Sequence, residues 1–168
     1  CTVRGEIYLP KSEFNRINST METPYANPRN LAAGTLRRIK SSDVAKIPLN
    51  IFVYEGFFTP PIPSHREALR ALEDLGFRVN PRIGVFSEAR MEACILEDER
   101  WFRGNYSRVE DFIFREREDR STLDYEIDGL VFKVDDLSIR EDLGYTGHHP
   151  RWALAYKFES PAIGRAKV

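Results

Sequence analysis

Alternation of apolar and polar side chains predicts a β-strand at residues 2–9. The apolar positions of this segment are Val3, Gly5, Ile7 and Leu9. Because side chains in a strand point alternately to opposite faces, we expect these residues to pack on a core. Arg4 and Glu6 then share the opposite, polar face.

Four further segments have the character of strands. They cover residues 49–54, 82–86, 130–134 and 151–158. In the last of them, one face carries Trp152, Leu154, Tyr156 and Phe158. The other face carries Arg151, Ala153, Ala155 and Lys157. Two alanines between two cations leave space above the sheet, where a flat ligand with a phosphate fits.

Capping residues and helical periodicity predict the helices. Ser64 and Glu67 form a capping box, leucines follow at helical spacing, and Gly76 closes the segment. The charged stretch 88–118 predicts one or two helices, with a break near residues 104–105. Strands interrupted by varied helices indicate an α+β fold with mainly antiparallel sheets and flanking helices.

Residues 29–38 predict another helix. Its expected inward residues are Leu31, Ala32 and Leu36. Arg29 and Arg37 lie eight positions apart, a little over two helical turns, and we expect them on one stripe of the helix. Taken alone, each arginine is a weak signal for phosphate binding.

Length and composition limit the class of protein. A chain of 168 residues with 42% hydrophobic residues suits one folded domain. Two cysteines form neither a disulfide framework nor a four-thiolate zinc site. Without a signal peptide or an apolar run near the roughly 20 residues of a membrane span, we expect a soluble, cytoplasmic protein that needs no membrane. Because a strand begins directly after Cys1, we also expect a piece of a longer protein.

Charge argues against a protein that coats nucleic acid by bulk attraction. The net charge is −1, from 25 basic and 26 acidic residues. The two ends of the chain are net basic, however, and the middle is acidic. Nucleic-acid binding would therefore depend on particular side chains.

Two carboxylates are candidates for chemistry. Glu6, on the polar face of the first strand, is an ordinary exposed residue, accepts a hydrogen bond from a ribose hydroxyl, or holds a metal ion. Asp128 precedes Gly129, and the pair either forms a common turn or directs a carboxylate towards Mg²⁺. Simple alternation places Asp128 and Lys133 on opposite faces, so one site would need a turn or bulge near Gly129.

Two lysines lie within apolar strands. Lys133 and Lys157 fit equally well as surface residues with apolar stems or as phosphate ligands in a cleft. Acids and phosphate-binding cations on a sheet suit phosphoryl or nucleotidyl transfer, which depends largely on positioning and charge stabilisation. The sequence has no Walker loop, dinucleotide fingerprint or Ser-His-Asp pattern.

Four segments in order resemble a known family. They are residues 3–6, 27–37, 126–134 and 150–158. The Asn-Pro-Arg-Asn sequence from Asn27 and the Pro-Arg-Trp-Ala sequence from Pro150 are the most specific. Together they resemble the adenylation (nucleotidyltransferase) domain of bacterial NAD-dependent DNA ligases, across essentially the whole chain.

The resemblance implies a reaction. Such ligases form a lysyl-AMP from NAD, pass AMP to the 5′-phosphate of nicked duplex DNA, and join that phosphate to the 3′-hydroxyl. By position, Glu6 would contact the AMP ribose, Asp128 would act with Mg²⁺, and Lys133 and Lys157 would bind the AMP phosphate and stabilise developing charge. The resemblance also assigns nucleotide or DNA phosphates to Arg29, Arg37 and Arg120.

The chain departs from the family pattern in one decisive motif. No Lys-x-Asp-Gly sequence, which carries the nucleophilic lysine in the family, occurs here. We therefore expect residues 1–160 to be part of an adenylation domain, inactive alone, with 161–168 as a tail or linker. Zinc is expected only in other parts of a parent ligase. The alternative is a non-catalytic module that binds a nucleotide or nicked DNA.

Overall fold

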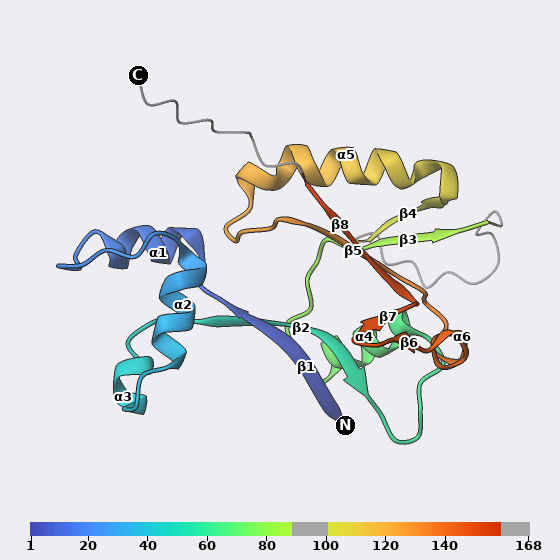
Figure 1. Ribbon diagram of the computed structural model, residues 1–168, viewed down its shortest axis with the longest axis horizontal. Helices are drawn as coiled ribbons and strands as arrows, with labels where there is room; N and C mark the ends of the chain where they lie inside the picture. Colours follow the sequence, from blue (N-terminus) through green and yellow to red (C-terminus); the bar gives the residue numbers. More distant parts are fainter. Residues whose placement is uncertain (89–100, 159–168) are drawn as a thin grey trace.

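The computed structural model describes residues 1–88 and 101–158 (Figure 1). The strands are β1 (Thr2–Tyr8), β2 (Asn50–Phe57), β3 (Gly84–Ser87), β4 (Phe102–Asn105), β5 (Gly129–Lys133), β6 (Tyr145–Thr146), β7 (His149–Pro150) and β8 (Ala153–Lys157). The helices are α1 (Lys11–Asn18), α2 (Pro28–Leu36), α3 (Ser41–Val44), α4 (His65–Asp74), α5 (Val109–Asp119) and α6 (Leu137–Leu143), with short 3₁₀ turns at Tyr106–Arg108 (η1) and Arg120–Thr122 (η2).

The described strands pair two by two, and most pairs are antiparallel. The antiparallel pairs are β1–β2, β5–β8 and β6–β7, whereas β3 and β4 run parallel. The prediction of an α+β fold with mainly antiparallel sheets is confirmed. The predicted helical character of residues 102–105 is wrong, because they form β4 beside β3. The expected tail at 161–168 lies outside the described residues.

Apolar side chains form two cores at different places along the β1–β2 ribbon. One core joins α4 to β2 through Val53, Leu69, Leu72, Val79 and Trp101. The other joins α2 to the end of β1 through Leu9, Leu31, Ala32 and Ile47. None of the helices within the described ranges is long and apolar enough to cross a bilayer.

Helix α4 begins and ends as its sequence predicts. The Ser64 hydroxyl accepts a hydrogen bond from the Glu67 backbone N–H at 3.3 Å, and Gly76 follows the helix with a φ of +85°. The inward face predicted for α2 is only partly correct. Leu31 and Ala32 are buried, whereas Leu36 is 50% exposed.

The β1–β2 ribbon contains a bulge that matters for the site. Arg4 pairs with Glu55 and Gly5 with Val53, which leaves Tyr54 as the extra residue on β2. The predicted burial of alternate residues on β1 is wrong for Val3 and Ile7, which are 36% and 40% exposed.

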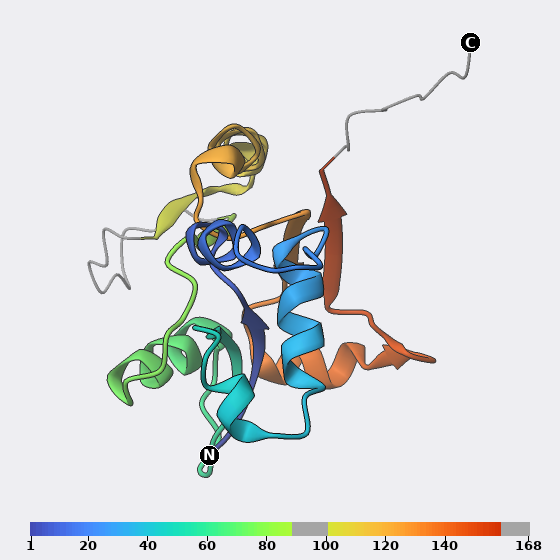
Figure 2. The same cartoon turned by 90° about the vertical axis from the view of Figure 1, so that its left-hand side faces the viewer.

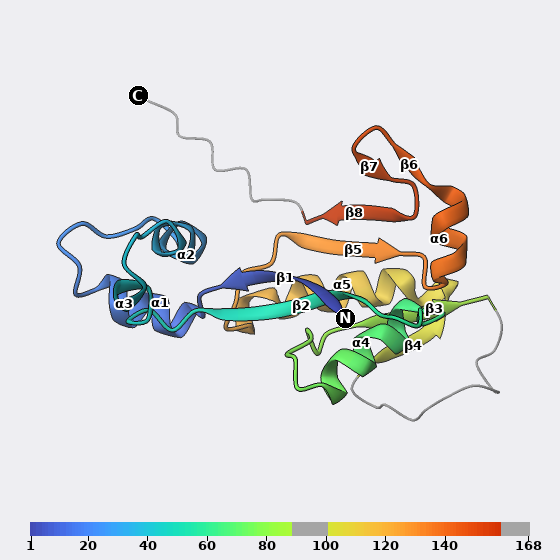
Figure 3. The same cartoon turned by 90° about the horizontal axis from the view of Figure 1, so that it is seen from below.

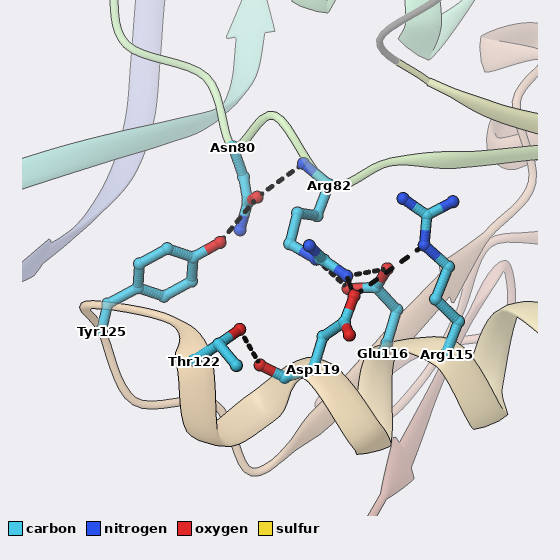
Figure 4. A network of polar contacts seen from close by, with 7 residues as sticks. All are labelled: Asn80, Arg82, Arg115, Glu116, Asp119, Thr122 and Tyr125. Carbon is cyan, nitrogen blue, oxygen red and sulfur yellow. Dashed lines mark hydrogen bonds and ion pairs between the residues drawn. The ribbon is translucent and has the colours of Figure 1, made fainter.

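An ion network ties the loop before β3 to α5 (Figure 4). Arg82 donates through Nε to Glu116 at 2.6 Å and through Nη2 at 3.0 Å, and Nη2 also pairs with Asp119. Glu116 is only 3% exposed, and its hydrogen bond with Arg82 raises the pKa of that guanidinium. The Tyr125 hydroxyl donates to Asn80 at 3.3 Å nearby, so the network also holds the segment that leads to β5.

Candidate active site

The register of β5 and β8 brings the two strand lysines to one face. Gly129 pairs with Lys157 and Lys133 with Ala153, and paired residues of an antiparallel sheet share a face. The lysines lie at opposite ends of this face, about 13 Å apart along the strands at roughly 3.3 Å per residue. Between them lies the pair Val131 and Ala155, and Val131 is 61% exposed. An open strip therefore separates Lys133 from Lys157. The predicted space lay over Ala153 and Ala155, between Arg151 and Lys157, and of these two alanines Ala155 is exposed and Ala153 half-buried.

Asp128 lies at the Lys157 end of this face. Its carboxylate Oδ2 is 4.0 Å from Lys157 Nζ, and both side chains are exposed. Its backbone carbonyl accepts a hydrogen bond from Phe158 N–H at 2.8 Å. Asp128 precedes the first residue of β5, so strict strand alternation does not govern its side chain. The structure thus brings Asp128 and Lys157 together, on a face that also carries Lys133.

Gly129 allows the close approach of the two strands. A Cβ atom built on Gly129 would lie 2.1 Å from the Tyr156 carbonyl oxygen and 2.8 Å from Lys157 Cα. Because both contacts are with backbone, no side-chain rotation relieves them. Asp128 and Lys157 come together where only glycine fits on β5.

Lys133, at the other end of the face, has a different environment. Its Nζ lies 5.1 Å from the ring centroid of Tyr54, a distance suited to a cation–π contact. Burial lowers the pKa of Lys133, Arg140 and Arg4 lower it further, and only the charge of Glu55 raises it. Figure 3 shows the β1–β2 ribbon running beside β5 and β8, which explains how side chains of β2 reach Lys133.

The sequence analysis did not single out Tyr54, Glu55 or Arg140. Tyr54 reaches Lys133 from the β2 bulge. Glu55 could have been identified from the sequence, because it is a charged residue within an apolar strand. Arg140 is 6% exposed and stacks on Trp152 with a distance of 4.4 Å between guanidinium carbon and ring centroid. A short helix with an arginine offers no such signal in sequence.

Glu6 lies on the face of β1 that also carries Arg4, as predicted. It pairs with Phe52 of β2 and is exposed. Arg4 Nη1 donates to Glu55 Oε2 at 2.9 Å, so this face of the ribbon is continuous with the side chains around Lys133. Glu6 therefore lies on the ribbon face that carries Arg4 and Glu55.

The three candidate arginines are spread over the periphery. Arg29 lies in the first turn of α2 and Arg37 caps its end, both exposed, and Arg120 begins η2 half-buried. Figures 1 and 2 show α2 at one end of the β1–β2 ribbon, apart from α5. Asp119, which precedes Arg120, is held by Arg82. No ion pair joins these three arginines to other residues in the described ranges, so all three guanidinium groups remain available to anions.

The donor set at Asp128 fits a magnesium ion that arrives with a phosphate. Within the described ranges, no group of three or more His, Cys, Asp or Glu residues is placed to hold a metal. Mg²⁺ in proteins is commonly held by one or two carboxylates, with phosphate oxygens and waters completing its shell. Asp128 supplies one such carboxylate, with the cationic Lys157 beside it at 4.0 Å.

Pockets elsewhere on the surface do not include these residues. One of about 470 Å³ lies between α5 and Tyr156, on the opposite face of β8 from the lysines. Another, of about 360 Å³, lies at the end of β1 and is lined by Tyr8, Arg78 and Tyr125 among others. Neither pocket contains a candidate residue, and we favour the face of β5 and β8 because it carries Lys133 and Lys157, with Asp128 beside Lys157.

Comparison with known proteins decides the family. The family model for the NAD-dependent DNA ligase adenylation domain matches residues 1–161. The chain belongs to this family. It is 42% identical over 160 residues to a DNA ligase of Borreliella afzelii (strain PKo). The matched region covers 94% of the chain and 22% of the relative. A DNA ligase of Borrelia hermsii (strain HS1 / DAH) is 41% identical to the chain over 167 residues. The matched region covers 99% of the chain and 23% of the relative.

A DNA ligase of Borreliella burgdorferi (strain ZS7) is 44% identical over 160 residues, covering 94% of the chain and 22% of the relative. The chain thus spans less than a quarter of the length of these ligases. Family membership confirms the resemblance found in sequence. Its four segments form β1, α2, β5 with the residues that precede it, and β8 with the residues that precede it.

Proposed function

We propose that this chain supplies the AMP-binding face of a ligase that seals 5′-phosphate/3′-hydroxyl nicks in duplex DNA, using NAD through lysyl-AMP and DNA-adenylate intermediates. The observation that carries the proposal is the shared face of Lys133 and Lys157, with Asp128 beside Lys157. An open strip with an ammonium group at each end suits a nucleotide, because the strands set where the two lysines start and charge stabilisation depends on such positioning.

Each candidate residue has a role in this proposal. Lys157 binds the AMP phosphate at the end of the β5–β8 face that carries Asp128. Lys133 binds the nucleotide at the other end, beside Tyr54, and adds positive charge. Glu6, on the adjoining ribbon, accepts from the ribose hydroxyls. Asp128 would hold Mg²⁺ against the phosphate, and the ion would neutralise phosphate charge there.

The three candidate arginines, of which Arg29 and Arg37 are exposed and Arg120 is half-buried, suit the DNA part of the reaction. We propose that Arg37 and Arg120 bind phosphates of nicked DNA, and that Arg29 binds either nucleotide or DNA phosphate. An unpaired guanidinium group is well suited to bidentate phosphate binding. Removing one such contact should weaken binding to all sequences similarly and reduce its dependence on salt.

The lysine that accepts AMP in this family has no counterpart in the sequence, so we propose that the chain alone does not form lysyl-AMP. Mass spectrometry after incubation with NAD and Mg²⁺ checks this directly. We expect no increase in mass corresponding to covalent AMP. A covalent adduct would refute this part of the proposal.

Titration calorimetry of the chain with AMP and with adenosine tests the nucleotide site. We expect AMP to bind more tightly, and Lys157→Ala to lower AMP affinity about 10- to 100-fold, since a hydrogen bond to a charged group contributes about 1.5–3 kcal/mol. The matched control is Lys46→Ala, which removes an exposed lysine that pairs with Asp43 at 3.1 Å. Equal AMP affinity in Lys157→Ala and wild type would contradict the phosphate role.

A further inference from the structure

The 3₁₀ turn η2, which carries Arg120, is held from two sides by segments that are distant in sequence. Arg82, in the loop before β3, pairs with Asp119, the residue before Arg120 (Figure 4). From the other side, Lys11 at the start of α1 donates through Nζ to the carbonyl of Ser121, the residue after Arg120, at 3.3 Å. Both sequence neighbours of Arg120 are therefore attached to other elements.

Asp124, two residues after η2, makes the main attachment to α1. Its backbone carbonyl accepts a hydrogen bond from the Lys11 N–H at 2.8 Å. Its carboxylate accepts from the Ser12 N–H at 2.8 Å and from the Ser12 hydroxyl at 2.7 Å. Hydrogen bonds to an ionised acceptor are roughly twice as strong as neutral ones. Together with the bond from Lys11 to Ser121, these bonds form what we call the α1–η2 contact.

The carboxylate of Asp124 supplies a cap that α1 otherwise lacks. The residue before α1 is Pro10, and its side chain makes no capping hydrogen bond. The first N–H groups of a helix have no partner within it, and the helix dipole favours a negative charge there. The helix itself is fixed, because Phe14 and Ile17 pack against one of the two cores. The α1–η2 contact therefore ties η2 to a packed element.

Arg120 lies between these attachments and keeps its guanidinium group unpaired. It is half-buried, and among the residues whose structure is described no carboxylate forms an ion pair with it. A guanidinium group is suited to bidentate binding of a phosphate. Because the backbone on either side of Arg120 is already held, less conformational entropy is lost when such a contact forms.

We propose that Asp124 is a positioning residue for the binding of nicked DNA, which holds η2 against α1 and so presents Arg120 to a DNA phosphate. The inference rests on the proposed function, which assigns that phosphate to Arg120. Asp124 carries a negative charge that repels phosphate, so its favourable contribution comes through the position of η2.

The test is a double-mutant cycle on the binding of the chain to a nicked duplex, followed by fluorescence anisotropy over a series of low salt concentrations. We expect Arg120→Ala to weaken binding about 10-fold or more and to reduce the salt dependence by about one counterion. Asp124→Ala should weaken binding about three- to tenfold when Arg120 is present, and less than about twofold when Arg120 is already alanine. Loss of a carboxylate by itself strengthens attraction to DNA, so charge alone predicts the opposite change.

Two control variants separate positioning from charge and from general loosening. Asp124→Asn has the same charge as Asp124→Ala but keeps an oxygen acceptor for the Ser12 N–H, and we expect it to retain most of the wild-type affinity. Asp74→Ala, which removes an exposed acid at the end of α4, should not weaken binding. Equal losses from Asp124→Ala with and without Arg120, or a gain in affinity, would overturn the inference.

Amide hydrogen exchange in the free chain tests the α1–η2 contact without DNA. Asp124→Ala should speed exchange at the Lys11 and Ser12 amides, whose partners lie in Asp124, while the amides of α4 keep their rates. Unchanged exchange at these two amides overturns the inference and leaves the DNA role of Arg120 standing. If the wild-type chain does not bind nicked DNA, or Arg120→Ala binds as tightly as wild type, the proposed role of Arg120 fails and the inference fails with it.

Discussion

Replacing Gly129 with alanine should separate β5 from β8 and disrupt the Asp128–Lys157 end of the site. The added Cβ would lie 2.1 Å from the Tyr156 carbonyl oxygen, where an ordinary contact is 3.4–4 Å. The strands must therefore move apart by more than about 1 Å, against the hydrogen bonds of the ladder. Overpacking of this kind costs about 1–3 kcal/mol, and we expect the upper end because the clash is with backbone.

Thermal unfolding measures the cost. For a chain of this length, about 3 kcal/mol corresponds to a fall in Tm of roughly 6–12 °C. The control is Gly76→Ala, where no atom lies within 4 Å of the added Cβ and the φ of +85° alone costs about 1–2 kcal/mol. Gly129→Ala should also weaken AMP binding, whereas Gly76→Ala should not. A Tm for Gly129→Ala within 2 °C of wild type, or above that of Gly76→Ala, would refute the reasoning.

Stability should also depend on pH through His65. The unfolded chain binds this proton near pH 6.5 and the folded chain only near pH 3, so stability is full above pH 6.5 and is lost as pH falls towards 3. Between pH 7 and 5 we expect a loss of about 2 kcal/mol in denaturant titrations, which His65→Asn should largely abolish; equal pH dependence in both proteins would contradict this. Arg82→Met should cost about 3–5 kcal/mol in such titrations, because it leaves Glu116 buried and unpaired. Arg115→Met, which removes an exposed pair at 3.9 Å, should cost less than about 1 kcal/mol, and similar losses in the two variants would argue against the buried network.

Local sequence signals predicted the elements whose structure is set locally. The capping box of Ser64 and Glu67 specifies the start of α4, because hydrogen bonds within one turn decide it. The pairing of β3 with β4 was not predictable in this way. Residues 102–105 show no apolar alternation beyond Phe102 and contain Gly104, and only contact with residues 84–87 makes them a strand.

The site was predictable in its residues more than in its arrangement. Lys133 and Lys157 attracted notice because lysines are uncommon in apolar strands, but their shared face depends on the register of β5 and β8. Tyr54 was not identified, because its position comes from a bulge that one extra residue creates in β2. Burial of Glu55 and Arg140 likewise follows from packing between distant segments.

Mapping of AMP onto the chain by NMR tests the central claim most directly. Backbone amide shifts would be followed during titration with AMP at near-neutral pH. The lysine-face account predicts that the largest changes lie at Gly129, Val131, Ala155 and Lys157, and that they weaken in Lys157→Ala. Changes confined to the α5–Tyr156 pocket on the opposite face, or to the pocket at the end of β1, would contradict it.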